Sequence, residues 1–404
     1  MKPTIEQIRA QFPSLKSGFA FFENAGGSQV PQQVIDRVSA FFKDSYVQTS
    51  AGYAASDRAD AVVAEAKAFA NLLMNAGDTG KMIIGPSTTD LIYRLANAYG
   101  EILNEGDEII ISVANHESNI GPWVRLERFG VKIVWWGVDP ASGDYSYDEL
   151  ERLVTDKTKV IAVSHTSNLL GDILEAKRVS QIARNAGARS VIDGVAFAPH
   201  QAIDVQVFGC DHYVISNYKV YAPHMAMLFG TNEAWAELTG PNHYFIEKDN
   251  LPWKFELGCQ PYELLGGLLG FGEYLCFLEG AGKVRPDRET VEGAYGLIRS
   301  LEMQVQERLM GYLLSRDDLR IVGPRTGDES RHPTICFLKQ GQNAIETVAK
   351  VNDGTVGIRY GHMYASRLCE ALGAPVDSGF VRVSAVHYNT LEEADRLIAK
   401  LDQI

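Results

Sequence analysis

The chain has 404 residues and a formal net charge of −13 at neutral pH. This length exceeds one typical hydrophobic core, so two domains are expected. The acidic balance argues against non-specific binding to nucleic acid or to an anionic membrane, although a local basic pocket remains compatible with it. With 46% hydrophobic and 22% charged residues, the composition is that of an ordinary globular protein.

The five cysteines and nine histidines form neither a disulfide pattern nor a metal-binding pattern. The number of cysteines is odd, no two are spaced as C-x-x-C, and no secretory hydrophobic region opens the chain. A reduced, cytoplasmic location is therefore expected. No apolar run reaches the roughly 18 residues that a membrane helix needs, and no metal site is predicted.

Helices and short apolar strands alternate through the first two thirds of the chain. A helix followed by a loop is predicted first over residues 4–17, and helices follow over 31–42 and 57–74. Seven strands are then predicted, at Lys81–Ile84, Glu108–Val113, Lys132–Trp136, Val160–Ser164, Ser190–Ile192, Tyr213–Ile215 and Met225–Phe229. The intervening helices are predicted at 89–102, 120–129, 147–153 and 176–186. This alternation predicts an α/β domain with a mainly parallel sheet sandwiched by helices.

The pattern changes near residue 260. Long helices are predicted at 264–278 and 291–314, and shorter ones at 344–351 and 392–401. Short strands are predicted between them, at 320–322, 334–338 and 380–383. This part is expected to form a smaller α+β domain. The predicted division is a large domain over 20–260 and a small domain over 1–19 and 261–404.

Two charged residues at predicted strand ends indicate the chemistry. Lys219 closes a polar turn after the strand Tyr213–Ile215, and Asp193 ends the preceding strand. A lysine that forms a Schiff base and an aspartate that keeps a pyridinium nitrogen protonated are the two groups that pyridoxal phosphate requires. The ordinary roles of these residues, a solvated surface lysine and a helix-capping aspartate, are the alternatives. The pair predicts a pyridoxal-phosphate enzyme.

Short motifs in a fixed order carry a family resemblance. They are Phe22-Glu-Asn-Ala-Gly26, Thr88-Thr89-Asp90, Asn115-His116-Glu-Ser-Asn119, His165-Thr-Ser-Asn168, Asp193-Gly194, Ser216-Asn-Tyr-Lys219, Phe255-Glu-Leu-Gly258, Gly361-His362 and Val381-Arg382. From about Phe21 to Leu401 the chain resembles aminotransferase class V, in the cysteine desulfurase-like branch of fold-type I pyridoxal-phosphate enzymes. The resemblance implies that fold, with seven strands in the large sheet, and a homodimer with shared active sites.

The resemblance also implies roles for single residues. Lys219, Asp193 and His116 would be catalytic, with the flat His116 ring stacked on the cofactor. Thr88 and Thr89 open a helix, whose positive end suits the cofactor phosphate. The remaining cofactor contacts would be Asn168, Ser216, Tyr218 and Cys259. Substrate contacts would be Asn24, Asn168, Arg359, Tyr364 and Arg382, with the planar fork of Arg382 on the α-carboxylate.

Four positions depart from the family pattern. Tyr364 stands where cysteine desulfurases carry the loop cysteine that stores sulfur, and a phenol cannot hold a persulfide. Ala196 replaces a glutamine at the cofactor, Tyr218 replaces a histidine, and Cys259 replaces a threonine expected near the partner subunit's phosphate. Cys369 lies five residues after Tyr364, where a buried structural thiol is the simpler interpretation.

These departures favour a lyase that eliminates a sulfur group from the β-carbon of an L-amino acid without a persulfide on the loop. An aminotransferase and an amino-acid epimerase are the alternatives that share the cofactor. A desulfurase that uses Cys369 or Cys259 remains open, as does a catalytically inactive member that binds the cofactor as a structural or regulatory module. The resemblance alone does not identify the substrate.

Overall fold

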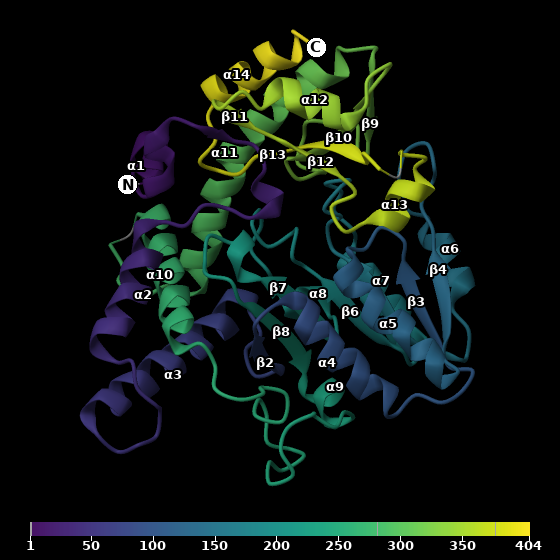
Figure 1. The fold of residues 1–404 in the computed structure, drawn as a ribbon. Coiled ribbons are helices and arrows are strands. Elements are labelled where there is room, and N and C mark those ends of the chain that lie inside the picture. The colour runs from purple at the N-terminus through teal and green to yellow at the C-terminus, as the bar shows by residue number, and fades with distance from the viewer. Residues whose placement is uncertain (1, 281, 376) are drawn as a thin grey trace.

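The computed structural model describes residues 2–280, 282–375 and 377–404. A seven-stranded sheet forms its centre, in the order β2-β8-β7-β6-β5-β3-β4 (Figure 1). The strands are β2 (Gly80–Gly85), β3 (Glu108–Ser112), β4 (Lys132–Trp136), β5 (Thr158–Ser164), β6 (Arg189–Asp193), β7 (His212–Ser216) and β8 (Ala226–Thr231). Among them β8 alone runs antiparallel to its neighbours. The predicted α/β class and all seven predicted strands are confirmed.

Continuous apolar runs form these strands because helices bury both faces of the sheet. Neighbouring residues of one strand point into different clusters. Ile110 belongs to a cluster with helices α3 (Ala54–Met74), α10 (Tyr262–Glu279) and α11 (Arg288–Leu314), whereas Ile109 belongs to one with α4 (Thr88–Gly100) and α5 (Gly121–Val124). The sequence of such a strand does not alternate between polar and apolar residues. Its length and its polar ends identify it instead.

The predicted helices are present, two of them with a different extent, and two further short helices, at 205–208 and 232–236, were not predicted. Their bounds are α1 (Ile5–Ala10), α2 (Gln32–Asp44), α3 (Ala54–Met74), α4 (Thr88–Gly100), α5 (Gly121–Val124), α6 (Tyr147–Leu153), α7 (Ala176–Asn185), α8 (Val205–Phe208), α9 (Asn232–Ala236), α10 (Tyr262–Glu279), α11 (Arg288–Leu314), α12 (Ala344–Val351), α13 (Ser366–Ala371) and α14 (Leu391–Leu401). The helix expected within 4–17 ends at Ala10 because Pro13 cannot continue it, and a 3₁₀ turn follows. The one expected over 120–129 is α-helical only to Val124 and then 3₁₀.

A smaller antiparallel sheet, in the order β12-β13-β10-β9, lies above the large sheet in Figure 1. Its strands are β9 (Leu319–Val322), β10 (Thr334–Lys339), β12 (Arg359–Gly361) and β13 (Phe380–Ser384). A further pair, β1 (Ala20–Phe21) and β11 (Val356–Gly357), is parallel. Strands β1, β11 and β12 were not predicted, because two or three residues are too few to show a period. The predicted domain boundaries stay a prediction.

Helix α11 contributes to two separate cores. Val291, Tyr295 and Ile298 join the cluster beneath the large sheet, and Val305 and Leu309 join the cluster of the small sheet. One continuous helix therefore connects the two parts of the molecule.

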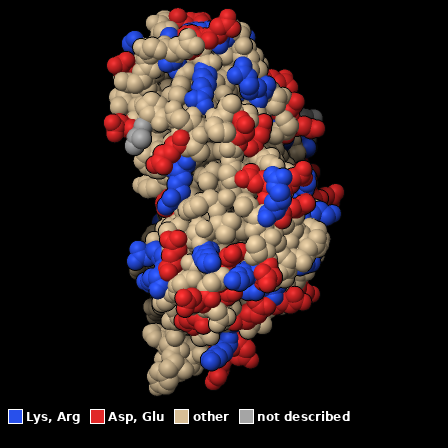
Figure 2. Space-filling view, turned by 90° about the vertical axis from the view of Figure 1, so that its right-hand side faces the viewer, with Lys and Arg blue, Asp and Glu red and all other residues tan. Residues whose placement is uncertain are grey.

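The surface shows no segregation of charge by sign on the face drawn in Figure 2, where acidic and basic side chains are interspersed. No described helix is long and apolar enough to cross a membrane. Within the described residues, no group of three or more histidine, cysteine or carboxylate side chains is arranged to hold a metal ion.

Candidate active site

Two adjoining pockets lie at the carboxyl ends of the parallel strands, where ligands of open α/β sheets usually bind. The inner pocket is lined by Ser87, Thr88, Thr89, His116, Ser118, Ser164, Thr166, Asn168, Asp193, Val195, Ala196, Ser216, Tyr218 and Lys219. The outer pocket, with a volume of about 460 Å³, shares six of these residues and adds Ala25, Gly26, Tyr93, Glu117, Gly121, Arg359, Met363, Tyr364 and Arg382. The pockets are therefore one continuous site with an inner and an outer part.

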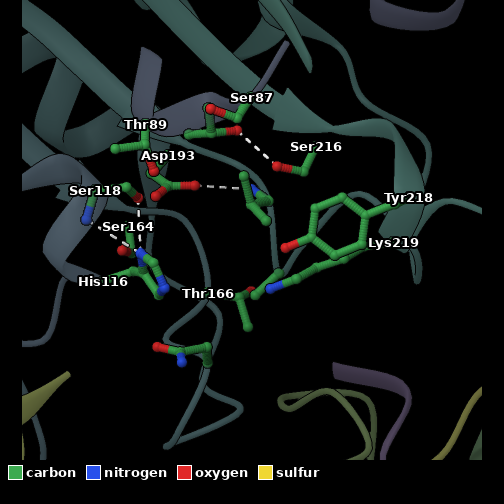
Figure 3. Close-up of a pocket in the computed structure, with 14 residues that line it drawn as sticks. Ser87, Thr89, His116, Ser118, Ser164, Thr166, Asp193, Ser216, Tyr218 and Lys219 are labelled. Carbon is green, nitrogen blue, oxygen red and sulfur yellow. Dashed lines mark hydrogen bonds between the residues drawn. The ribbon is translucent and has the colours of Figure 1, made fainter. Parts of the chain in front are cut away.

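Lys219 enters the inner pocket from a short turn after β7. Residues Asn217–Lys219 form one 3₁₀ turn, and the next bend places Tyr221 in the left-handed region with φ of 64°. Ser28 fixes this bend, because its Oγ contacts the Lys219 carbonyl at 3.1 Å and accepts the Tyr221 N–H at 3.0 Å. Figure 3 shows the amine pointing into the pocket. Burial, aided by the Arg382 charge, lowers the pKa of Lys219, and Asp193 opposes that shift.

Asp193 supplies a buried carboxylate at the end of β6. Its Oδ1 accepts the Val195 N–H at 3.0 Å, and its side chain borders the same pocket as Lys219. Burial raises the pKa of Asp193, while the Val195 hydrogen bond and the Lys219 charge lower it. A carboxylate in this setting is stabilised by a cationic partner, which a protonated pyridine nitrogen would provide.

His116 follows β3 and reaches into the pocket from the side opposite Lys219 (Figure 3). Its Nδ1 accepts hydrogen bonds from the Ser118 hydroxyl at 2.7 Å and the Ser118 N–H at 3.1 Å. The neutral ring therefore carries its proton on Nε2. Burial, with the charges of Lys219 and Arg382, lowers the pKa of His116 to about 3, so the ring is uncharged at neutral pH.

The start of α4 borders the inner pocket through Ser87, Thr88 and Thr89. Ser87 caps the helix by accepting the Asp90 N–H at 3.1 Å, and Thr88 Oγ1 lies 2.7 Å from Ser216 Oγ. The first N–H groups of a helix have no partner within it, and they carry the positive end of the helix dipole. A phosphate monoester fits this end of the pocket.

Arginines from the small sheet line the outer pocket. Arg382 on β13 is 3% exposed and lies directly across from Arg359 on β12. Arg382 Nη1 donates to the Asn168 carbonyl at 3.2 Å, and both guanidinium groups contact the carboxylate of Glu23. The outer pocket thus has a cationic group suited to binding a carboxylate.

The loop before α13 folds over the outer pocket. The Asn168 side chain donates to the Met363 carbonyl at 2.8 Å, and the Glu117 N–H donates to the Tyr364 carbonyl at 2.7 Å. Met363 and Tyr364 both have positive φ values, 49° and 60°. The Tyr364 ring lies 5.3 Å from the His116 ring, tilted by 36°. Tyr364 is therefore held beside the inner pocket in a strained backbone conformation.

Two predicted site residues lie outside both pockets. Cys259 is exposed, and its Sγ is 3.5 Å from Gln48 Oε1. Asn24 is buried, with Nδ2 bonded to the Ser384 carbonyl and to Asn389 Oδ1, and with Oδ1 accepting the Tyr388 hydroxyl at 2.6 Å. Its amide thus joins the N-terminal segment to residues 384–389.

The structure adds residues to the site that the sequence interpretation omitted. Ser87 and Ser118 position α4 and His116, and Ser164 and Thr166 border the inner pocket at and just after the end of β5. Glu23 pairs with the two arginines. Two signals were available for these residues: polar side chains at the ends of predicted strands, and a carboxylate adjacent to the motif residue Asn24.

Comparison with known proteins agrees with this geometry. The family model for aminotransferase class-V matches residues 20–397. The aminotransferase-like protein FGM3 of Gibberella zeae is 35% identical, over 99% of this chain and 98% of its own. A cysteine desulfurase of Pectobacterium atrosepticum is 30% identical, over 100% and 98%. The apo cysteine desulfurase of Thermococcus onnurineus NA1 superposes with a TM-score of 0.87 at 23% identity, over 100% and 98% of the two chains.

A buried lysine and aspartate beside a helix-start anion site define a pyridoxal-phosphate enzyme of fold type I. The chain belongs to aminotransferase class V, and it is a PLP-dependent enzyme. The residues present fit the cofactor, because a carboxylate, an amine, a flat imidazole and an anion-binding end converge on one pocket.

Proposed function

We propose that this enzyme is a carbon–sulfur lyase that eliminates a sulfur group from the β-carbon of an L-amino acid. The observation that carries the proposal is the absence of a thiol from the site: no cysteine is among the described residues that line either pocket. Tyr364 is at the loop position where a sulfur-storing cysteine was expected, and Cys369 is buried with its pKa raised to about 12. Without a thiol among the residues that line these pockets, sulfur has no acceptor there and would leave as a free thiol.

Residues of this chain would hold the cofactor from four sides. Asp193 would face its ring nitrogen, His116 its ring and Lys219 its aldehyde, with Thr88, Thr89 and Ser216 at its phosphate. Once bound, pyridoxal phosphate draws electrons from the substrate α-carbon and makes its C–H bond acidic.

The remaining steps are assigned to side chains of the site. Arg382 and Asn168 would orient the substrate carboxylate. Lys219 Nζ, whose lowered pKa favours the free amine, would take the α-proton. The sulfur group would depart with the electron pair of the broken C–S bond and become a thiol after protonation. Addition of water would then release pyruvate and ammonium, which balances the reaction.

Product analysis tests this proposal. The cofactor-loaded enzyme would be incubated with L-cysteine and with S-substituted L-cysteines. We expect thiol (sulfide from cysteine) and pyruvate in equal amounts over many turnovers, with no persulfide on any cysteine by mass spectrometry. The Cys369→Ser variant should keep its turnover within about twofold, since a buried thiol outside the site takes no part. A persulfide, or loss of turnover in that variant, would instead identify a desulfurase.

An aminotransferase is the second candidate, favoured by the printed description of the 35% identical relative as aminotransferase-like. In that case the keto acid would retain the β-substituent of the substrate. The cofactor would be left in its amine form, and a 2-oxo acid would be needed to restore it. Inversion of the substrate without any keto acid would instead indicate an epimerase.

We also propose that the enzyme is a homodimer, with Cys259 near the partner subunit's site. Large apolar side chains are exposed on two segments near Cys259. Tyr46 and Tyr53 flank Gln48, which contacts Cys259, and Phe245 and Trp253 precede Cys259 in the sequence. Clustered exposed apolar groups of this kind usually mark an interface. Sedimentation velocity at micromolar concentration should give the mass of two chains. A monomer that retains full turnover would contradict shared active sites.

A further inference from the structure

Glu23 contacts both Arg359 and Arg382, the pair that we call the arginine fork. The proposed function assigns Arg382 to the substrate carboxylate. The Oε1 of Glu23 lies 3.2 Å from Arg382 Nη2 and 3.2 Å from Arg359 Nη1. The Arg382 side chain is 3% exposed, whereas that of Glu23 is 34% exposed. A partly solvated carboxylate is therefore paired with a buried cation that lines the outer pocket.

The two arginines require an anion between them. Arg359 and Arg382 are directly paired across β12 and β13, and like charges in that relation destabilise a sheet. The Glu23 carboxylate offsets their repulsion, and a substrate carboxylate at the same place would do so equally. The space between the two arginines is thus suited to one carboxylate, either that of Glu23 or that of a substrate.

The backbone around Glu23 is built to bring its side chain back over this place. Glu23 forms an isolated bridge with Ser384, and the Ser384 N–H donates to the Phe22 carbonyl at 2.8 Å, so the segment is fixed beside β13. A Cβ added to Gly26 would lie 1.9 Å from Glu23 Oε1. Only glycine at this position leaves room for the carboxylate where it is.

Glu23 satisfies the arginine only in part. Arg382 Nη1 donates to the Asn168 carbonyl and Nη2 contacts Glu23, while the buried Nε has no partner among the described residues. The Asn168 Oδ1, also buried, has none either. A ligand that offers two carboxylate oxygens and a neighbouring donor can satisfy more of these atoms than Glu23 does.

We propose that Glu23 is a specificity-determining residue that holds Arg382 in the free enzyme and must be displaced by the substrate carboxylate. The inference rests on the proposed function only in using Arg382 as the carboxylate site. Displacement leaves Glu23 free to stay with Arg359, which is half exposed. The exchange selects substrates that bind through more than their carboxylate, because a simple carboxylate gains little over Glu23 itself.

Propanoate is a suitable probe because it has a carboxylate but no amine, and so it cannot react with the cofactor. Its affinity would be measured by calorimetry on the cofactor-loaded enzyme and on three variants. Glu23→Gln removes the competing charge and keeps the shape. Glu117→Gln removes the same charge at the mouth of the outer pocket, where Glu117 lies 3.8 Å from Arg367 instead of Arg382. Arg382→Gln removes the site.

We expect Glu23→Gln to bind propanoate about 5- to 30-fold more tightly than the unmodified enzyme, the range for one charge-assisted contact at a partly solvated carboxylate. Glu117→Gln should change the affinity by less than about twofold, and Arg382→Gln should bind none. If a variant is only partly folded, thermal melts of each protein with and without propanoate should still give the same ranking of propanoate affinities.

Unchanged or weaker binding by Glu23→Gln would overturn the inference, since Glu23 would then be neutral or a supporting contact. An equal gain in Glu117→Gln would also overturn it, because general electrostatics would be the cause. Neither result depends on the reaction, so the lyase proposal is judged separately by its products.

Discussion

At the scale of single residues, the site contains two basic side chains, His116 and Lys219, that differ in how readily they bind a proton. Burial keeps His116 neutral and lowers the pKa of Lys219, but only Lys219 has a carboxylate that opposes the shift. The imidazole is therefore suited to lie against a ring, and the amine to exchange a proton near neutral pH. This division of roles follows from position, since both residues are at strand ends that the sequence also identifies.

Lys219→Ala tests the covalent role. We expect turnover to fall by about 10³-fold or more, the range for loss of a positioned acid–base group. Borohydride reduction of the loaded enzyme followed by mass spectrometry should add the cofactor mass to the unmodified protein and not to the variant. Lys132→Ala, at an exposed position on β4, should keep the label. A labelled Lys219→Ala protein would place the imine on another lysine.

At the scale of elements, the start of α4 combines a helix cap with a position at the inner pocket. The Ser87 side chain caps α4 and also borders the inner pocket. Thr390 caps α14 in the same way, within a capping box, but it lines neither pocket. The two caps allow stability and cofactor binding to be measured separately.

Ser87→Ala and Thr390→Ala should each lower the free energy of unfolding of the apoprotein by about 1 kcal/mol, as loss of an N-cap does. Only Ser87→Ala should also weaken cofactor binding, by about 3- to 10-fold, because it loosens the helix end that receives the phosphate. Urea unfolding and cofactor titration by fluorescence measure the two effects. Equal cofactor affinities would show that the cap does not act on the phosphate site.

The elements also show what the sequence could and could not predict. The strands β3, β5 and β6 were predictable because each is an apolar run that ends in polar residues. Ser164 and Thr166 belong to such an end but carry no motif of their own. The Glu23–Arg382 pair joins residues 359 positions apart, and the isolated bridge between Glu23 and Ser384, beside β13, brings them together. The buried hydrogen bonds of Asn24 depend on the same tertiary contact.

At the scale of the whole molecule, stability depends on pH through buried histidines. Burial lowers the pKa of five of the nine, namely His116, His165, His212, His332 and His387. Each binds a proton more readily in the unfolded chain, so unfolding takes up protons and stability is lost as the pH falls below about 6.5. Burial also raises the pKa of Asp172 and Asp193 to about 6. Protonation of these two carboxyl groups in the folded protein stabilises it below about pH 6, but only two groups then act against the five histidines.

The apoprotein should therefore be less stable at pH 5.5 than at pH 7.5, by on the order of 5 kcal/mol if all five histidines remain uncharged when folded. Urea unfolding at the two pH values measures the difference, and the urea midpoint should shift with little change in slope. An equal midpoint at both values would show that the folded protein accepts protons on these rings.

Helix α11 has a mechanical consequence for the site. Arg359 and Arg382 belong to the small sheet and Lys219 to the large one, and α11 links their cores, with Ile298 as a buried residue of the first core and Val305 as one of the second. The 16 residues that follow Ile298, up to Leu314, make a lever about 24 Å long. A bend of only about 5° just after Ile298 would move its far end by roughly 2 Å. A slight bend of α11 would thus shift the core of the small sheet, which carries Arg359 and Arg382, by a distance close to the length of a hydrogen bond.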